Sequence, residues 1–154
     1  MKWLWLSALA VMLDQISKQV ANAQLVLHNS VAIFTNFNFT LIYNQGAAFS
    51  FLSNAGGWQR WFFTVLSIVI SIVLFVWLKK LDHSKRLLAA GLAFILGGAI
   101  GNLIDRVLYG HVIDFIDVYY KTHHWPAFNL ADSAITLGAC LLILDMLLER
   151  KTHG

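Results

Sequence analysis

Two aspartates in the second half of the chain have the side chains needed for acid–base catalysis. They are Asp114 and, later in the chain, Asp132, which stands three residues after Asn129. Two carboxyl groups brought within a few ångströms cannot both ionise comfortably, so they share a proton and titrate as a unit. One of them can then act as a base on water while the other protonates a substrate carbonyl. This is the chemistry of aspartic peptidases, and it requires a fold that brings Asp114 and Asp132 together.

A second set of polar residues stands at helical spacing. Asn102, Asp105 and Arg106 occupy positions i, i+3 and i+4, so they share one face of a helix. Asp14 and Lys18 are four residues apart, or about one helical turn. Simpler interpretations remain open for both groups. Asp14 and Lys18 would form an ion pair within one helix, and Asp105 with Arg106 would snorkel to a membrane interface.

The remaining candidates also have structural interpretations. Asn129 and Asp132 suit the N-terminus of a helix, where Asn caps and an acidic first turn is favourable. His123 and His124 are adjacent and poorly placed to bind one metal together, which favours solvated loop residues. Cys140 is the single cysteine and has no partner for a disulfide or a cysteine metal site. Neither the histidines nor the cysteine therefore indicates a metal site.

The composition makes the bilayer the solvent for most of the chain. Of 154 residues, 58% are hydrophobic and 12% are charged, and the mean hydropathy is +0.66. A soluble domain usually carries about 25% charged residues, so a solitary soluble domain is excluded. The net charge of +3 comes from Lys and Arg that are scattered or flank apolar runs. These residues act as topology signals, and we expect no nucleic acid partner.

The apolar runs predict four membrane spans. Residues 61–78 and 87–104 are two uncharged stretches separated by a basic tip, and the second span extends to about residue 108. A third run at 128–148 is long enough to cross, although it holds Asp132 near its start and Asp145 near its end. We predict spans at about 3–25, 61–78, 87–108 and 128–148.

The first of these spans has an alternative interpretation. Lys2, an apolar stretch and the run 21–23 (Ala-Asn-Ala) resemble a cleavable signal peptide with a small-residue site. Against cleavage, the segment before that site holds both Asp14 and Lys18, which is unusually charged for a cleavage region. We therefore expect a retained span.

The basic residues predict the orientation. Seven Lys and Arg fall on one face of a four-span protein and two on the other, which makes the richer face cytoplasmic. The seven are Lys2, Lys79, Lys80, Lys85, Arg86, Arg150 and Lys151, and the two are Arg60 and Lys121. Both termini are then cytoplasmic. Asp105 lies 18 residues beyond Leu87, or roughly 27 Å along a helix, which places it near the outer boundary.

The segment from residue 26 to residue 57 is expected outside the membrane and carries no charge. Residues 36–41 alternate polar and apolar side chains, which is the pattern of a strand, and 44–46 (Asn-Gln-Gly) offer a turn. We expect its aromatic face to rest on the membrane surface or the bundle; the face comprises Phe34, Phe37, Phe39, Phe49 and Phe51. The sequence thus predicts an all-α membrane protein over residues 1–154, a single domain of four transmembrane helices with a small extracytoplasmic β element after the first.

Five ordered motifs resemble those of the bacterial lipoprotein signal peptidase family, signal peptidase II. They are Asp14-x-x-x-Lys18, 43–49 (Tyr-Asn-Gln-Gly-Ala-Ala-Phe), 101–106 (Gly-Asn-Leu-Ile-Asp-Arg), 112–115 (Val-Ile-Asp-Phe) and 128–133 (Phe-Asn-Leu-Ala-Asp-Ser). The motifs extend over nearly the whole chain, although the loop expected at 118–127 has no distinctive match. The resemblance implies an aspartic peptidase with no metal and no other cofactor. It also places the enzyme in the bacterial cytoplasmic (inner) membrane, with its active site near the outer face.

The same resemblance implies a substrate and a set of site residues. The family removes the signal peptide of prolipoproteins after diacylglyceryl modification, cutting just before the lipidated cysteine. By motif position the catalytic pair is Asp114 and Asp132. The positions that shape or line the site are Asp14, Asn44, Asn102, Arg106 and Asn129, with Lys18 at a motif position whose role is open. Membrane lipid is an expected partner, and no oligomer is required.

Other functions make use of intramembrane carboxylates. A presenilin-type protease carries Tyr-Asp and Gly-x-Gly-Asp, whereas here Asp114 follows Val-Ile and Asp132 follows Leu-Ala. A proton-coupled transporter usually has its site near the midplane and internal repeats, which this chain lacks. A non-catalytic membrane assembly factor would use the aspartates only to pack helices. The last two remain the alternatives.

Overall fold

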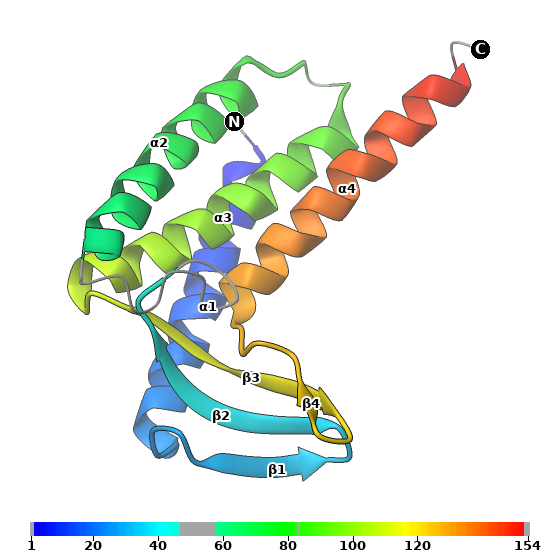
Figure 1. Cartoon of the computed structure of the whole chain (residues 1–154). Helices are drawn as coiled ribbons and strands as arrows, with labels where there is room; N and C mark the ends of the chain where they lie inside the picture. The colour runs from blue at the N-terminus through cyan, green and yellow to red at the C-terminus, as the bar shows by residue number, and fades with distance from the viewer. Residues whose placement is uncertain (1, 47–57, 83, 153–154) are drawn as a thin grey trace.

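The computed structural model describes residues 2–46, 58–82 and 84–152. Four long helices form a bundle, and a small sheet lies at one end of it (Figure 1). The helices are α1 (Leu4–Gln24), α2 (Trp58–Lys80), α3 (Arg86–Leu108) and α4 (Leu130–Thr152). The start of α1, the end of α4 and the connection from α2 to α3 all lie at the end opposite the sheet. We call these the sheet end and the terminal end.

Three of the four helices have the length and composition of membrane spans. Within the described residues, α2, α3 and α4 to Glu149 are apolar enough over 18 residues to cross a bilayer. The helix α1 has 21 residues, roughly 31 Å at 1.5 Å per residue, but Asp14 and Lys18 lower its hydropathy. The apolar runs in the sequence therefore located all four helices, each within four residues at either end.

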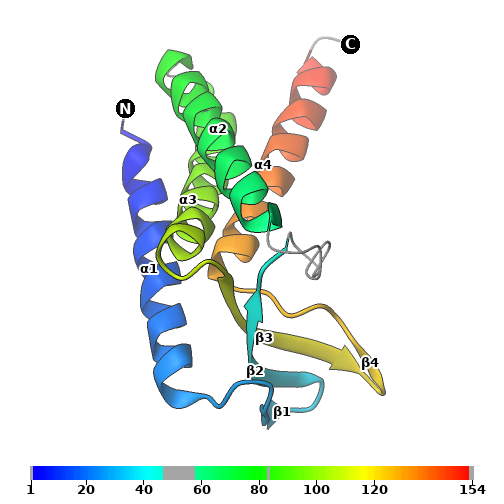
Figure 2. The same ribbon diagram turned by 60° about the vertical axis from the view of Figure 1, so that its left-hand side comes forward.

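The helix α3 is central and packs against the other three (Figure 2). Close approach depends on small residues on two of its faces. A Cβ added at Gly101 would lie 2.6 Å from the Asp14 carboxylate of α1, and one at Gly98 would lie 2.3 Å from the Ala131 carbonyl oxygen of α4. Small residues at such positions let helix backbones meet in a membrane. Here they bring polar side chains of α1 and α4 against α3.

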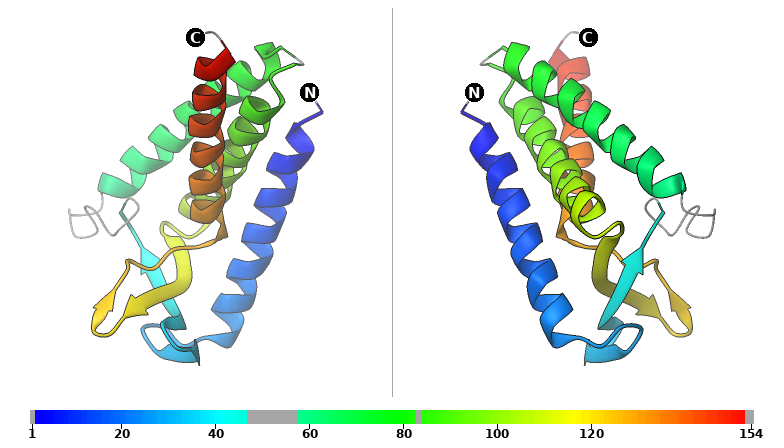
Figure 3. Two further views of the ribbon diagram at one scale, coloured as in Figure 1. Left: turned by 90° about the vertical axis from the view of Figure 1, so that its right-hand side faces the viewer. Right: turned by 90° about the vertical axis from the view of Figure 1, so that its left-hand side faces the viewer.

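The sheet is larger than the sequence predicts. Its four strands are antiparallel in the order β1 (Ser30–Phe34), β2 (Phe37–Asn44), β3 (Val112–Tyr120) and β4 (His123–His124). The predicted β element accounts for β1 and β2 only. The strands β3 and β4 come from the segment between α3 and α4, where the sequence analysis predicts no strand (Figure 3). An all-α class is therefore too narrow for this fold.

The pairing of β2 with β3 places their ends beside the helices. Asn44 pairs with Val112 and Ile42 with Asp114, so the last residues of β2 lie next to the first residues of β3. Two hydrogen bonds also tie α1 to this end of the sheet: Tyr43 Oη donates to Asn22 Oδ1, and Gln19 Nε2 donates to the hydroxyl of Tyr109. Side chains at the end of β2 and the start of β3 are thereby fixed against the bundle.

The aromatic residues predicted to form one face of the β element make a ladder. Phe34 stacks on Phe37 at 5.0 Å between ring centroids, and Phe37 contacts Phe39 at 5.4 Å. The ladder continues to Phe115 of β3 at 6.0 Å. Phe49 and Phe51 lie outside the described residues. Phe34 at the tip is largely exposed, whereas Phe37 and Phe39 are half-buried.

Candidate active site

Asp132 is fixed by a reciprocal cap at the start of α4. The Asp132 amide N–H donates to Asn129 Oδ1 at 2.9 Å, and the Asn129 amide N–H donates to Asp132 Oδ2 at 3.3 Å. This is the pattern of a capping box, in which a cap residue and a side chain three positions later satisfy each other's backbone. The capping interpretation is thus confirmed. It holds the Asp132 carboxylate over the first turn of the helix.

Asn129 also binds the second aspartate. Its Nδ2 donates to Asp114 Oδ1 at 2.7 Å. Its Oδ1 accepts from the Asp132 amide, and its own amide donates to the Asp132 carboxylate. One asparagine is therefore hydrogen-bonded to both acidic residues. Asn129 is fully buried, so these bonds are not exchanged with water.

Asp114 lies in a nearly closed environment at the start of β3. It is 2% exposed, and its second oxygen accepts a hydrogen bond from Asn44 Nδ2 at 3.0 Å. Burial, followed by the nearby charge of Asp132, raises the pKa of Asp114 to about 7. Hydrogen bonds from Asn44 and Asn129 oppose this rise because they favour the ionised form. Asp114 therefore exchanges its proton near neutral pH.

Asn102 of α3 donates to the other side of Asp132. Its Nδ2 lies 2.8 Å from Asp132 Oδ1, and its Oδ1 accepts from Lys18 Nζ at 2.8 Å and from Asn129 Nδ2 at 3.2 Å. Two donors point at Asn102 Oδ1, and this fixes the orientation of the amide. If the amide were rotated by half a turn, its NH₂ group would face the donors of Lys18 and Asn129. Asn102 therefore presents its own donor to Asp132.

A buried charge cluster supports this arrangement from behind. Lys18 Nζ lies 2.8 Å from Asp14 Oδ2 and 2.8 Å from Asp105 Oδ2, and all three side chains are fully buried. The ion pair predicted within α1 is confirmed, but it also includes Asp105 of α3. Asp105 further accepts from the backbone N–H of Ile113 at 3.1 Å, and Asp14 accepts from that of Ala131 at 2.9 Å. The cluster thus joins α1 and α3 to the residues that precede the two candidate aspartates.

Arg106 approaches the site from the end of α3. Its guanidinium donates to the carbonyl oxygens of Asn102 at 3.3 Å and Gly46 at 3.4 Å, and it lies over the ring of Phe63. Arg106 is 9% exposed and Asp105 is 0% exposed. Interfacial snorkelling is therefore the wrong interpretation for both residues, because they face the interior of the bundle.

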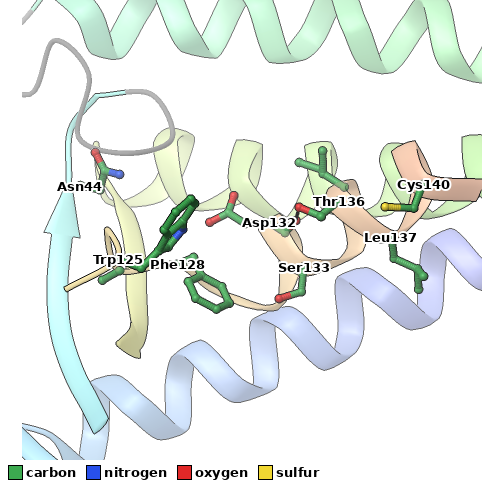
Figure 4. Close-up of a pocket in the computed structure, with 10 residues that line it drawn as sticks. Asn44, Trp125, Phe128, Asp132, Ser133, Thr136, Leu137 and Cys140 are labelled. Carbon is green, nitrogen blue, oxygen red and sulfur yellow. Dashed lines mark hydrogen bonds between the residues drawn. The ribbon is translucent and has the colours of Figure 1, made fainter. Parts of the chain in front are cut away.

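A cavity of about 790 Å³ opens beside Asp132. Figure 4 shows Asp132 projecting from α4 toward Trp125, with Asn44 opposite on β2. The cavity continues along α4 past Thr136 to Cys140, and most of its wall is apolar. Asp114 does not line the cavity, but its carboxylate is hydrogen-bonded to Asn44, which does. The cavity therefore has a polar end at Asp132 and Asn44 and an apolar length along the helix.

Comparison with known proteins identifies the family. The signal peptidase II model, a peptidase family, matches residues 6–148. The chain belongs to the signal peptidase II family. A lipoprotein signal peptidase of Alteromonas mediterranea is 55% identical over 146 residues, which cover 95% of this chain and 80% of the relative. One from Teredinibacter turnerae is 53% identical over 151 residues, covering 98% and 90%.

Two solved structures of bacterial membrane enzymes share the fold of this chain. A bacterial membrane enzyme solved by the in meso method at 2.3 Å resolution matches with a TM-score of 0.88 and 30% identity, over 99% of this chain and 92% of that chain. A second, solved at 1.9 Å, matches with a TM-score of 0.80 and 31% identity over 95% and 92%. The protein is thus a multi-pass bacterial membrane enzyme, an aspartic peptidase that cleaves the signal peptides of prolipoproteins.

All eight residues that the family motifs assign to the site meet at the sheet end. They are Asp14, Lys18, Asn44, Asn102, Arg106, Asp114, Asn129 and Asp132. Hydrogen bonds or ion pairs link each of them to at least one other, directly or through its backbone. Part of the second motif, residues 47–49, lies outside the described residues.

Sequence reasoning missed Gln15. Its Nε2 donates to Asp105 Oδ1 at 2.8 Å and to the Gly101 carbonyl oxygen at 3.1 Å. A polar side chain beside Asp14 in an otherwise apolar helix was the signal for it. The cavity wall formed by Trp125 and Phe128 was also missed. Trp125 lies in the segment 118–127, which has no distinctive motif, and Phe128 begins the fifth motif but was not among the predicted site residues.

Asp117 contrasts with Asp114 on the same strand. It accepts hydrogen bonds from Asn38, Thr40 and His124, the last at 2.8 Å. Burial pushes the pKa of Asp117 up, but these bonds outweigh it and hold the pKa below its usual range. His124, interpreted above as a solvated loop residue, lies in β4, and its ring contacts the Asp117 carboxylate. In residues 2–46, 58–82 and 84–152 no group of three His, Cys, Asp or Glu side chains could hold a metal ion.

Proposed function

We propose that this protein removes signal peptides from diacylglyceryl-modified prolipoproteins, cutting just before the lipidated cysteine, with Asp114 and Asp132 as its catalytic pair. One observation carries the proposal. The buried side chain and backbone of Asn129 bind both carboxyl groups at the polar end of an apolar cavity. This arrangement links the two acids through one asparagine and gives the cavity a wall suited to an acyl chain or an apolar peptide.

The geometry favours different roles for the two aspartates. Asp114 is closed off and has a pKa near neutral, so it is the member that holds the shared proton. Asp132 faces the cavity, so it is the member that takes a proton from the attacking water. The water oxygen bonds to the scissile carbonyl carbon as the carbonyl oxygen receives the proton held by Asp114. Collapse of the tetrahedral intermediate breaks the C–N bond, and the amine leaves with the proton taken up by Asp132. One hydroxyl of the intermediate returns its proton to Asp114 as the new carboxyl group forms, which restores the pair.

The neighbouring residues hold the pair in place. Asn102 and Asn129 keep Asp132 aimed at the cavity, and Asn44 holds Asp114 beside it. Lys18, which is paired with Asp14, donates to Asn102. Arg106 donates to the backbone carbonyl oxygens of Asn102 in α3 and of Gly46. No residue of a second copy is needed to complete this set, so the proposal requires no oligomer and treats the chain as a single membrane domain.

The proposed membrane arrangement has four spans with both termini in the cytoplasm. The fourth span is α1, whose two buried charges face α3 while apolar side chains face outward. The outward set includes Leu9, Met12, Leu13, Ile16 and Val20. Basic residues gather at the terminal end in the sequence, which favours the cytoplasm for that end. The sheet and the aspartate pair then lie at the outer face, where a lipidated cysteine holds its scissile bond.

The test is cleavage of diacylglyceryl-modified prolipoprotein by purified Asp114→Asn and Asp132→Asn variants. Each should lose turnover by about 10²–10⁴-fold, because each loses one proton-transfer group. The matched control is Asp117→Asn, which alters another buried carboxylate of β3 and should keep near wild-type turnover. Near wild-type turnover in either of the first two variants would remove that residue from catalysis. Loss of fold in both, seen by thermal unfolding, would favour an assembly factor.

A second arm tests the substrate. The same precursor without its diacylglyceryl group should be cleaved far more slowly, because the acyl chains no longer occupy the apolar length of the cavity. Equal cleavage of both precursors would contradict the proposed specificity while leaving the catalytic pair in place.

A further inference from the structure

A second groove lies between α1 and α2, away from the candidate active site. Both helices pack on α3 but scarcely touch each other, so α3 forms the floor between them (Figure 2). The groove has a volume of about 590 Å³ and shares no lining residue with the cavity beside Asp132. Its walls are Leu4, Ser7, Ala8, Val11 and Met12 of α1, Ser71, Ile72 and Phe75 of α2, and Leu96 and Ile100 of α3.

The groove runs from the middle of the bundle to a basic rim at the terminal end. Leu4 and Phe75 also line a small adjoining cavity that ends at Lys79. Lys2 and Arg86 line a further cavity of about 340 Å³ together with Trp3 and Trp5. No acidic residue lines any of the three cavities. Among the described residues, no ion pair within 4 Å occupies these three cations.

We propose that this groove binds one anionic glycerophospholipid, with an acyl chain between α1 and α2 and the phosphate at Lys2, Lys79 and Arg86. Apolar walls alone gain little in a bilayer, because lipid tails are as apolar as the side chains they replace. The preference for an anionic lipid therefore comes from the three cations, which form no ion pair among the described residues. Basic pockets beside membrane helices bind anionic headgroups in this way. Trp3 and Trp5 fit the headgroup level, where tryptophan is enriched.

The dimensions of the groove fit one leaflet. From Leu4 to Met12 is eight residues, or roughly 12 Å along α1. Half of a hydrocarbon core is about 15 Å, so a chain anchored at the basic rim would follow the groove for most of its length. A second copy of this chain is a poorer occupant, because in the same orientation it would bring a like-charged rim against Lys2, Lys79 and Arg86. The inference requires α1 to lie in the membrane but does not depend on the peptidase activity.

Native mass spectrometry of the full chain tests the inference, using titration with phosphatidylglycerol and with phosphatidylcholine. Phosphatidylglycerol should bind at least tenfold more tightly, because the proposed headgroup site is cationic and no acidic residue lines it. Lys79→Gln should weaken its binding about fivefold, whereas Lys80→Gln should not, because Lys79 lines the cavity that adjoins the groove and Lys80 does not. Equal affinity for the two lipids would overturn the selection by charge. Equal losses in the two variants would overturn the proposed site in favour of diffuse surface attraction.

A second pair of variants tests the groove itself without changing charge. Ala8→Phe fills the space between α1 and α2 and should abolish the preference for phosphatidylglycerol. Ala139→Phe, at an exposed position of α4 outside the groove, should keep it. A preserved preference in folded Ala8→Phe protein would overturn the acyl-chain part of the proposal, and the thermal unfolding of each variant establishes that it is folded.

Discussion

The two ends of the helix bundle are packed with opposite kinds of side chain. At the terminal end the buried cluster is wholly apolar, and it consists of Leu74, Leu78, Ala89, Leu92, Ala93 and Leu96. At the sheet end the same helix α3 buries Asn102, Asp105 and Arg106, and it meets Asp14 and Lys18 of α1. One helix thus changes from an apolar to a charged interior within two turns.

The difference indicates what each end is for. Taking charges out of water is costly, and replacing a buried ion pair by apolar residues of similar volume is often neutral or stabilising. Stability alone therefore does not explain Asp14, Lys18 and Asp105. Their bonds to Asn102 and to the backbone at Ile113 and Ala131 explain them better, because those bonds fix the two candidate catalytic groups. The terminal end holds the helices together, and the sheet end positions chemistry.

The largest expected difference in the free energy of unfolding is between substitutions of Lys18 and of Lys85. Lys18→Met leaves two buried carboxylates without their cation, so the free energy of unfolding should fall by about 3–5 kcal/mol. Turnover should also fall, because Asn102 loses the donor that orients it. Lys85→Met at the terminal end breaks only a half-exposed ion pair with Glu149 and should change neither property measurably. Thermal unfolding in detergent and cleavage assays measure both. Equal effects of the two substitutions would remove the distinction between the ends.

A substitution in the apolar cluster should affect stability alone. Leu92 is fully buried at the terminal end, and Leu92→Ala leaves a cavity that should lower the free energy of unfolding by about 2–4 kcal/mol. The pH dependence of cleavage by the folded fraction should be unchanged, because no titrating group contacts this cluster. A shifted pH profile would show that the two ends are coupled.

The smallest expected effect is a change in pH dependence. Cleavage should decline as the pH rises through about 7, because Asp114 then loses the proton that the pair shares. The hydrogen bond from Asn44 lowers the pKa of Asp114, so Asn44→Ala should move this decline to higher pH. Gln45→Ala, at the exposed neighbouring residue, should leave it in place. Profiles of kcat/KM against pH measure the shift, and a move to lower pH in Asn44→Ala would contradict the assignment.

The sequence predicted the helices and the site better than the sheet. Long uncharged runs located α2 and α3, since a span of about 20 apolar residues has few other uses. The strand β3 was missed because Asp114 and Asp117 interrupt its apolar pattern. Each aspartate is buried against polar partners from β2, and such pairing across 70 or more residues leaves no local signal.

The direction of a side chain was equally hard to predict. The helical rise placed Asp105 at the correct end of α3, but it did not decide between the lipid interface and the interior. That choice depends on Lys18 and Gln15 of α1, which lie about 90 residues earlier in the chain. Family motifs, by contrast, selected residues that all meet at the sheet end. Residues that serve one reaction must lie together in the fold, so their motifs predict proximity. The periodicity of a helix predicts only which residues share one face of that helix.

The central claim is that Asp114 and Asp132 share one proton, and infrared titration of the Asp114 carboxyl group tests it most directly. The signal is assigned by its absence in Asp114→Asn. In the wild-type protein the protonated band should disappear with a midpoint near pH 7, and in Asp132→Asn that midpoint should fall, because the neighbouring charge that raises it is gone. An identical midpoint in the two proteins would contradict the account.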